Sequence, residues 1–113
     1  MAVERQNITM YVDSNQWIEF VVEDVDTLAG AHIRWKMAAL GAHALPVITK
    51  TSDDVEEIAI VGTRFTVYIL PADNAGLSPG RYYHEARITD EHGHSRPVTS
   101  GFVLVQDTIT PSG

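Results

Sequence analysis

The sequence predicts an all-β fold, an antiparallel sandwich of seven or eight short strands. Apolar and polar residues alternate with period two in several stretches, most clearly over residues 31–37, 65–70 and 82–88. Turn residues separate such stretches at roughly even intervals, and no long stretch has helical periodicity. With 113 residues, 44% of them apolar, the chain is expected to form one domain over residues 1–113 with short polar termini.

The corner at residues 77–82 indicates which kind of sandwich this is. Leu77, Pro79 and Gly80 form a tight bend, because proline fixes φ and glycine accepts positive φ. Tyr82 follows at the start of a strand. The tyrosine corner of Greek-key sandwiches has an inward-facing tyrosine at this place, whose hydroxyl bonds the nearby backbone. These four residues are therefore predicted to be structural, in an immunoglobulin-like or fibronectin-III-like sandwich.

The first half of the chain holds four predicted strands. They cover residues 6–12, 16–23, 31–37 and 47–51. Phe20 falls on the inward phase of the second strand, and Trp35 on that of the third, where immunoglobulin-type sandwiches carry a core tryptophan. Both are predicted core residues. Residues 38–46 are expected to form a loop or a loose hairpin tip, because Gly41 interrupts the helical pattern there and Pro46 ends it.

The second half of the chain holds four more predicted strands. They cover residues 55–61, 65–70, 81–90 and 96–105. Phe65 and Val67 lie on the inward phase of their strand and are predicted core residues. A loop over residues 71–80 leads to the corner, and a hairpin tip over residues 91–94 joins the last two strands.

The inward face of the last strand is ambiguous in the sequence. Phe102 and Leu104 fall on one phase and Val103 and Val105 on the other, and both pairs are apolar enough to face the core. Gly101 predicts a β-bulge in this strand, since glycine inside a strand often marks one.

Charge and residue types narrow the possible functions. Fifteen acidic residues against eight basic ones give a formal charge of -7. Nucleic-acid binding is not expected, because phosphate contacts require clustered Lys and Arg, which are scattered here. The chain has no cysteine, which excludes a disulfide and a thiolate metal site. No signal peptide or membrane-spanning segment is expected, because the apolar runs are too short.

The most suggestive cluster for chemistry is His92-x-His94, beside Asp90 and Glu91. Two histidines two residues apart on a strand point the same way and can share a zinc or nickel ion, whereas a glycine-centred tip is more typical of a solvated turn. His84 falls on an inward phase and is expected to be a hydrogen-bonded core or rim histidine. No nucleophile elbow, phosphate-binding loop or EF-hand pattern occurs. We therefore expect no enzymatic activity and no cofactor, with a metal at the histidine pair as the alternative.

Several large apolar residues fall on the phase opposite to the predicted core. Trp17, Tyr68, Leu70 and Tyr83 form a candidate interface if several of them lie on one sheet. The alternative is that loops or the N-terminal segment cover them.

A series of motifs in the second half of the chain carries a family resemblance. A Phe-x-Val strand begins at Phe65, Leu-x-Pro-Gly-x-Tyr turns the corner at residues 77–82, and a strand ending at Asp90 leads through a glycine turn to a last strand that contains Gly101. In this order they resemble the small immunoglobulin-like proteins of tailed bacteriophages and prophages. The segment Gly30–Trp35 resembles the third strand of the same proteins. The motifs are moderately specific, because the corner recurs in other sandwich modules.

The resemblance implies a virion structural protein, a piece of the tail, baseplate, neck, fibre attachment or capsid decoration. It implies other virion structural proteins as partners, a symmetric homo-oligomer or multiple copies in the particle, and synthesis in the host cytoplasm. The charge and the short apolar runs add that neither nucleic acid nor a membrane is an expected partner. The outward aromatic residues support an alternative, a carbohydrate- or cell-surface-binding module in which Trp17 and Tyr68 stack on sugars. A small enzyme or metal protein using His92 and His94 is a third possibility.

Overall fold

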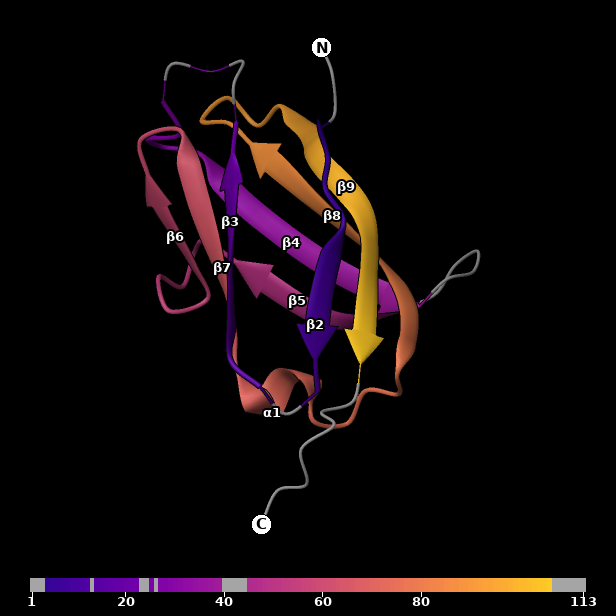
Figure 1. The fold of residues 1–113 in the computed structure, drawn as a ribbon. Coiled ribbons are helices and arrows are strands. Elements are labelled where there is room, and N and C mark those ends of the chain that lie inside the picture. Colours follow the sequence, from indigo (N-terminus) through magenta and orange to yellow (C-terminus); the bar gives the residue numbers. More distant parts are fainter. Residues whose placement is uncertain (1–3, 13, 23–24, 26, 40–44, 107–113) are drawn as a thin grey trace.

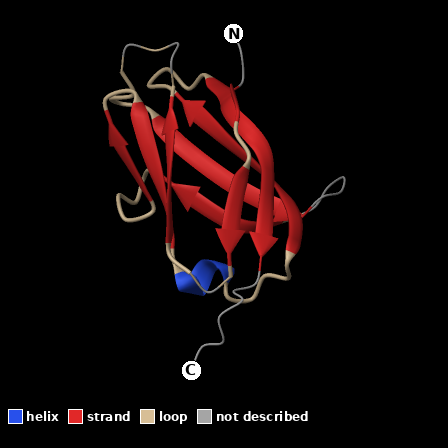
Figure 2. Ribbon diagram, in the orientation of Figure 1, coloured by secondary structure: helices blue, strands red, loops and turns tan. Residues whose placement is uncertain are grey.

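The computed structural model describes residues 4–12, 14–22, 25, 27–39 and 45–106. The strands are β1 (Glu4–Arg5), β2 (Ile8–Tyr11), β3 (Gln16–Val21), β4 (His32–Ala39), β5 (Pro46–Thr51), β6 (Ile58–Val61), β7 (Arg64–Ile69), β8 (Gly80–Thr89) and β9 (Ser95–Gln106), and one short helix, α1, covers Pro71–Asn74. They form two sheets that pack against each other (Figures 1 and 2). The larger sheet has the order β1-β9-β8-β4-β5, with β2 also beside β9, and the smaller sheet has the order β3-β7-β6.

This arrangement confirms the predicted fold class, an immunoglobulin-like β-sandwich. Trp35 lies on β4 and the corner precedes β8, so both hallmarks belong to the larger sheet, as in immunoglobulin domains. The neighbouring strands are antiparallel except for β1 and β2, which run parallel to β9. The described residues form one strand more than the predicted maximum, and the additional strand is β1.

The N-terminal segment forms two strands because its pairing with β9 is interrupted at Gln6 and Asn7. The backbone N–H of Gln6 donates to the Ser100 carbonyl oxygen at 2.8 Å. The backbone N–H of Phe102 donates to the side-chain oxygen of Asn7 at 3.1 Å. A side-chain acceptor therefore replaces a backbone carbonyl at this point, and regular pairing resumes at Ile8.

Gly101 makes room for this crossing. A Cβ at this position would overlap the carbonyl oxygen of Gln6 and lie 2.8 Å from its carbonyl carbon. The predicted position of the bulge is wrong. The register of β8 with β9 shifts between Ala86 and Arg87 and leaves Val98 without a partner in β8. Glycine is required here by the close approach of a second backbone rather than by a bulge.

The structure also settles the facing of β9. Val103 and Val105 are buried in the core, whereas Phe102 and Leu104 are exposed on the outer face of the larger sheet. Pairing with β8 and β2 on its two sides gives β9 this orientation.

The strand predicted over residues 55–61 begins only at Ile58. The preceding residues form turns, because Asp54 bonds its own neighbours. Its side-chain oxygen accepts the Glu56 N–H at 2.9 Å, and its carbonyl oxygen accepts the Glu57 N–H at 2.9 Å. An aspartate that caps the backbone in this way favours a turn over a strand.

Two other predicted segments fall largely outside the described residues. The loop predicted over residues 38–46 includes residues 40–44, which the structure does not describe, while β4 extends to Ala39 and β5 begins at Pro46. The polar tail predicted for residues 107–113 lies outside the described residues as well.

The loop predicted before the corner contains the helix α1. Asn74 is fully buried at its end. Its amide nitrogen donates to the carbonyl oxygens of Tyr11 at 3.1 Å and Ser14 at 3.0 Å. Asp73 forms an ion pair with the buried Lys50 of β5 at 2.7 Å. The helix therefore ties β5 to the turn between β2 and β3. No helix among the described residues is long and apolar enough to cross a membrane.

The core lies between the two sheets. The four residues predicted for it are all buried there: Phe20, Trp35, Phe65 and Val67. Phe20 of β3 and Phe65 of β7 stack with their ring centroids 5.0 Å apart. Burial of each such side chain stabilises the fold by roughly 1.5–3 kcal/mol relative to exposure.

The corner closes on its own backbone. Tyr82 is 9% exposed, and its hydroxyl donates to the carbonyl oxygen of Ser78 at 2.8 Å. Pro79 and Gly80 lie inside the loop that this bond closes, and Leu77 packs against the core. The corner thereby anchors the first residues of β8.

Replacing Tyr82 with phenylalanine measures this anchor. The free energy of unfolding should fall by about 1 kcal/mol, because the Ser78 carbonyl loses its donor while the ring stays. Tyr82→Ala should cost ~3–5 kcal/mol, because the ring is lost too. Tyr83→Phe is the matched control, since the neighbouring tyrosine is exposed. Urea unfolding compares the variants, and a Tyr82→Ala protein as stable as the wild type would contradict the corner.

Gly101→Ala tests the crossing of the N-terminal segment. We expect a loss of ~1–3 kcal/mol or more, because the added methyl group displaces Gln6 and weakens the pairing of β2 with β9. Gly76→Ala is the control, since a Cβ there meets no atom within 4 Å. Thermal unfolding gives the stability, and hydrogen exchange of the β2 amides reports the pairing. Unchanged exchange in the Gly101 variant would overturn this account.

Candidate functional site

The four residues predicted to form one interface lie on opposite faces of the sandwich. The smaller sheet contains Trp17 on β3 and Tyr68 on β7, and Leu70 directly follows β7. Tyr83 lies on the outer face of β8 in the larger sheet. Trp17, Tyr68 and Leu70 therefore remain a candidate interface, whereas the inclusion of Tyr83 in the same patch is wrong, because β8 belongs to the other sheet.

The smaller sheet carries what we call the Trp–Tyr patch, formed by Trp17, Tyr68 and Leu70. Trp17 and Tyr68 are direct cross-strand neighbours, with ring centroids 5.7 Å apart and planes at 90°. Trp17 is 72% exposed. This edge-to-face packing fixes the orientation of the indole. The two rings do not form a single flat surface. Tyr68 is half-buried, so Trp17 is the more exposed member of the pair.

The larger sheet carries the Tyr–Phe patch, formed by Tyr83, Phe102 and Leu104. Tyr83 and Phe102 are cross-strand neighbours on β8 and β9. The three side chains are 40–42% exposed. The guanidinium of Arg81 lies 5.3 Å from the ring centroid of Phe102, within the range of a cation–π interaction.

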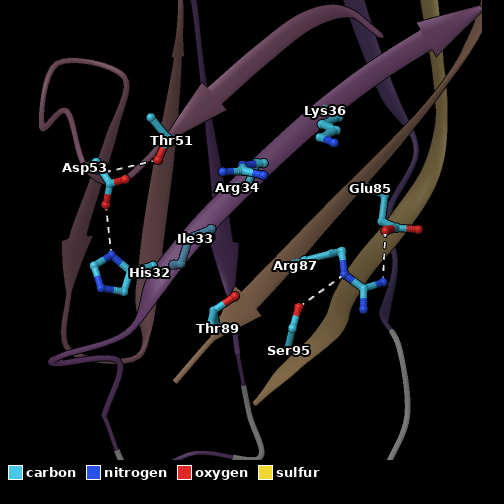
Figure 3. Close-up of a pocket in the computed structure, with 10 residues that line it drawn as sticks. All are labelled: His32, Ile33, Arg34, Lys36, Thr51, Asp53, Glu85, Arg87, Thr89 and Ser95. Atoms are coloured by element: carbon cyan, nitrogen blue, oxygen red, sulfur yellow. Dashed lines mark hydrogen bonds and ion pairs between the residues drawn. The ribbon is translucent and has the colours of Figure 1, made fainter. Parts of the chain in front are cut away.

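A polar depression of about 250 Å³ opens on the larger sheet as well (Figure 3). Three cationic side chains line it, Arg34 and Lys36 from β4 and Arg87 from β8. Two carboxylates also line it, Asp53 after β5 and Glu85 on β8. Counting these groups leaves one net positive charge in a chain whose formal charge is -7.

Both carboxylates of the depression are already engaged. Asp53 lies 2.8 Å from the ring nitrogen Nδ1 of His32, and Glu85 lies 3.4 Å from the Arg87 guanidinium. Arg34 lies between these two pairs in Figure 3. Among the described residues no ion pair within 4 Å involves Arg34 or Lys36. Glu85 is nevertheless the direct cross-strand neighbour of Lys36, whereas Arg34 lies opposite another arginine, Arg87. Arg34 is therefore the cationic group of the depression that has neither an ion pair nor an acidic cross-strand neighbour.

The histidine pair at the hairpin tip is organised by Asp90. One carboxylate oxygen of Asp90 accepts the backbone N–H groups of His92 and His94, both at 2.9 Å. The hydrogen bond from His94 is the main reason that the pKa of Asp90 lies below its ordinary value. Among the described residues no group of three or more His, Cys, Asp or Glu side chains is arranged to hold a metal ion. The tip is thus an aspartate-capped turn.

His84 is fully buried beside Trp35. The indole N–H of Trp35 donates to Nδ1 of His84 at 3.2 Å, and Nε2 of His84 lies 2.6 Å from the carbonyl oxygen of Gln6. A carbonyl only accepts, so Nε2 carries the proton and the ring is neutral. Burial lowers the pKa of His84 below its ordinary value of 6.5, and the bond to Gln6 partly opposes this.

The cationic depression was not predicted from the sequence. A signal was present, because Arg34, Lys36 and Arg87 all fall on the outward phase of their strands. The residues are far apart in the chain, however, and only the pairing of β4 with β8 places Arg34 directly opposite Arg87. Basic residues that are scattered along the sequence therefore form a cluster in the folded chain.

No protein-family model matches the sequence, and no curated protein matches it. Solved structures similar in fold include a voltage-gated sodium channel beta subunit studied for cell-adhesive interactions, at TM-score 0.49 and 13% identity over 92% of this chain and 93% of that one. The extracellular domain of the beta4 subunit, a parallel homodimer in cell–cell adhesion, has TM-score 0.41 and 13% identity over 96% and 97% of the two chains.

A third similar structure is a candidate glycoside hydrolase from Bacteroides vulgatus. It has TM-score 0.46 and 11% identity over 89% of this chain, which spans only 16% of the hydrolase. At these scores and identities the three structures carry no argument about function. The fold assignment rests on the sheet order, the core tryptophan and the corner.

Stability should depend on pH through His84. Because its pKa is lowered in the folded state, the unfolded chain takes up the proton first as the pH falls below about 6.5, and stability decreases from there towards the folded-state pKa. Urea unfolding at about pH 7.5 and about pH 5.5 should show this loss. A His32→Gln control should retain it, since His32 is exposed. NMR titration of the His84 ring gives a direct check, and a pKa at or above 6.5 would contradict the burial argument.

Proposed function

We propose that this chain is a protein-binding module that assembles with other protein chains in several copies, inside the particle of a tailed bacteriophage or prophage. One observation carries the proposal, the exposure of large aromatic side chains on both outer faces of the sandwich, above all Trp17. Exposed apolar patches of this kind typically mark protein interfaces. The phage setting is supported by the family resemblance of the motifs between residues 30 and 102.

The placement of the patches favours multiple contacts. The Trp–Tyr patch and the Tyr–Phe patch lie on different sheets, so one copy can contact two neighbours at the same time. Unlike patches on opposite faces join copies head to tail, which produces rings or stacks rather than closed dimers. The proposed partners are further copies and other virion structural proteins. The chain would be made in the host cytoplasm, and the proposal assigns it no catalytic step and no cofactor.

A carbohydrate- or cell-surface-binding module is the second candidate. The exposed indole of Trp17 favours it, because indole faces stack on sugar rings. The 90° angle between Trp17 and Tyr68 disfavours a platform that uses both rings. A glycan-binding measurement on the purified domain separates this candidate from the first.

Trp17→Ala should weaken assembly without unfolding the domain, because Trp17 is exposed and outside the core. An aromatic anchor at the centre of an interface contributes ~2 kcal/mol or more, which corresponds to a roughly thirtyfold loss of affinity. Val55→Ala is the control, since Val55 is equally exposed but lies in a turn. Tyr83→Ala probes the opposite face in the same way. Assembly is measured by sedimentation. If Trp17→Ala and Tyr83→Ala both assemble as strongly as the wild type and the Val55→Ala control, neither patch is supported as an interface.

The phage setting is tested on particles. Virions purified from a host that carries the gene should contain this chain, detectable by mass spectrometry. Its absence from mature particles and from their assembly intermediates would end the structural proposal. The carbohydrate-binding candidate would then come first.

A further inference from the structure

Two arginines lie opposite each other on the outer face of the larger sheet, and no described feature of the fold accounts for this pairing. Arg34 of β4 and Arg87 of β8 are direct cross-strand neighbours on the outer face. Like charges in this position destabilise a sheet. Glu85 relieves part of the repulsion at Arg87, but no described acidic group reaches Arg34. An anion bound between the two guanidinium groups would remove the remaining cost.

Hydroxyl groups complete the surroundings of this pair. Thr51 of β5 is the neighbour of Arg34 on its other side, so the row Thr51–Arg34–Arg87 crosses three strands. Ser95 accepts a bond from Arg87 at 3.4 Å and keeps its own hydroxyl proton to donate. Thr51 accepts the Asp53 N–H at 3.2 Å and likewise keeps a proton. The depression thus presents guanidinium and hydroxyl donors towards one space.

We infer that the depression binds a carboxylate, an acidic side chain presented by a protein partner. Its volume of about 250 Å³ fits one side chain better than an oligosaccharide or a cofactor. Guanidinium groups match carboxylates with two parallel hydrogen bonds. The single net positive charge of the lining suits a monoanion, whereas Asp53 and Glu85, which line the same space, repel a phosphate dianion more strongly.

The depression continues the Tyr–Phe patch along one strand. Tyr83, Glu85 and Arg87 are successive outward positions of β8, so the arginine lies about 14 Å from the tyrosine at the usual rise of a strand. A partner that covers both would place an apolar side chain on Tyr83 and an acidic one between Arg34 and Arg87. This inference rests on the proposed protein-binding function and specifies the chemistry of the partner surface.

An acetylated and amidated tetraglutamate peptide is the probe. In NMR titrations of the whole chain at low salt, saturable shifts are expected at the amides of Thr51, Arg34 and Arg87 and at the arginine Nε–H signals. Arg34→Gln should weaken binding about fivefold, the upper range for an exposed charge pair, and added salt should weaken it further. Arg64→Gln is the matched control. It removes the same charge from an exposed arginine on the other sheet, where Arg64 faces Glu19 at 3.6 Å.

The outcomes separate this inference from the proposed function. Equal loss of affinity in the two variants would mean diffuse attraction and overturn the site. Saturable binding of inorganic phosphate without binding of the peptide would overturn the carboxylate assignment. If the peptide fails to bind while Trp17→Ala still disrupts assembly, the inference falls and the protein-binding function stands. Peptide binding that depends on Arg34 supports the inference even if the chain is absent from particles.

Discussion

The close approach of the Gln6 backbone to β8 and β9 is the contact on which the larger sheet depends. The Gln6 carbonyl oxygen lies 2.6 Å from Nε2 of His84, and Gly101 leaves the space for it. His84 in turn accepts the indole N–H of Trp35 at the centre of the core. One hydrogen-bonded series therefore joins the N-terminal segment to β8 and β4, and it positions β2 so that Met10 is fully buried. A side chain at position 101 is incompatible with this whole arrangement.

The same cluster explains how the fold holds together without a disulfide. In antibody domains a disulfide joins two strands across the core and packs against a tryptophan, and its second cysteine lies two residues after the corner tyrosine. Here that position is His84, two residues after Tyr82, and Phe20 faces it from β3 with ring centroids 5.9 Å apart. Packing and hydrogen bonds take the place of the covalent link. The fold therefore does not depend on cysteine oxidation, while its stability is linked to the protonation of one imidazole.

The two outer faces differ in chemistry. Among the basic residues with described side chains, four lie on the outer face of the larger sheet: Arg34, Lys36, Arg81 and Arg87. This face combines cationic groups with the Tyr–Phe patch, whereas the opposite face presents the Trp–Tyr patch. Because the chain as a whole is acidic, the cationic face of one copy attracts most of the surface of another copy. Two cationic faces repel each other. Contacts between unlike faces are consequently favoured over self-pairing of the cationic one.

The sequence by itself determined the corner and eight of the nine described strands, β2 to β9. The direction of side chains along a strand follows from period two, and the bend before Tyr82 follows from its proline and glycine. Those signals are local. Only the tertiary structure decided that Arg34 lies opposite Arg87 and that Trp17 and Tyr83 face away from each other, since strand pairing joins residues that are distant in the chain. Most residues of the candidate surfaces could therefore be recognised as outward-facing, but their grouping into two patches and a depression could not. Grouping depends on which strands become neighbours, and the packing of the whole core selects them.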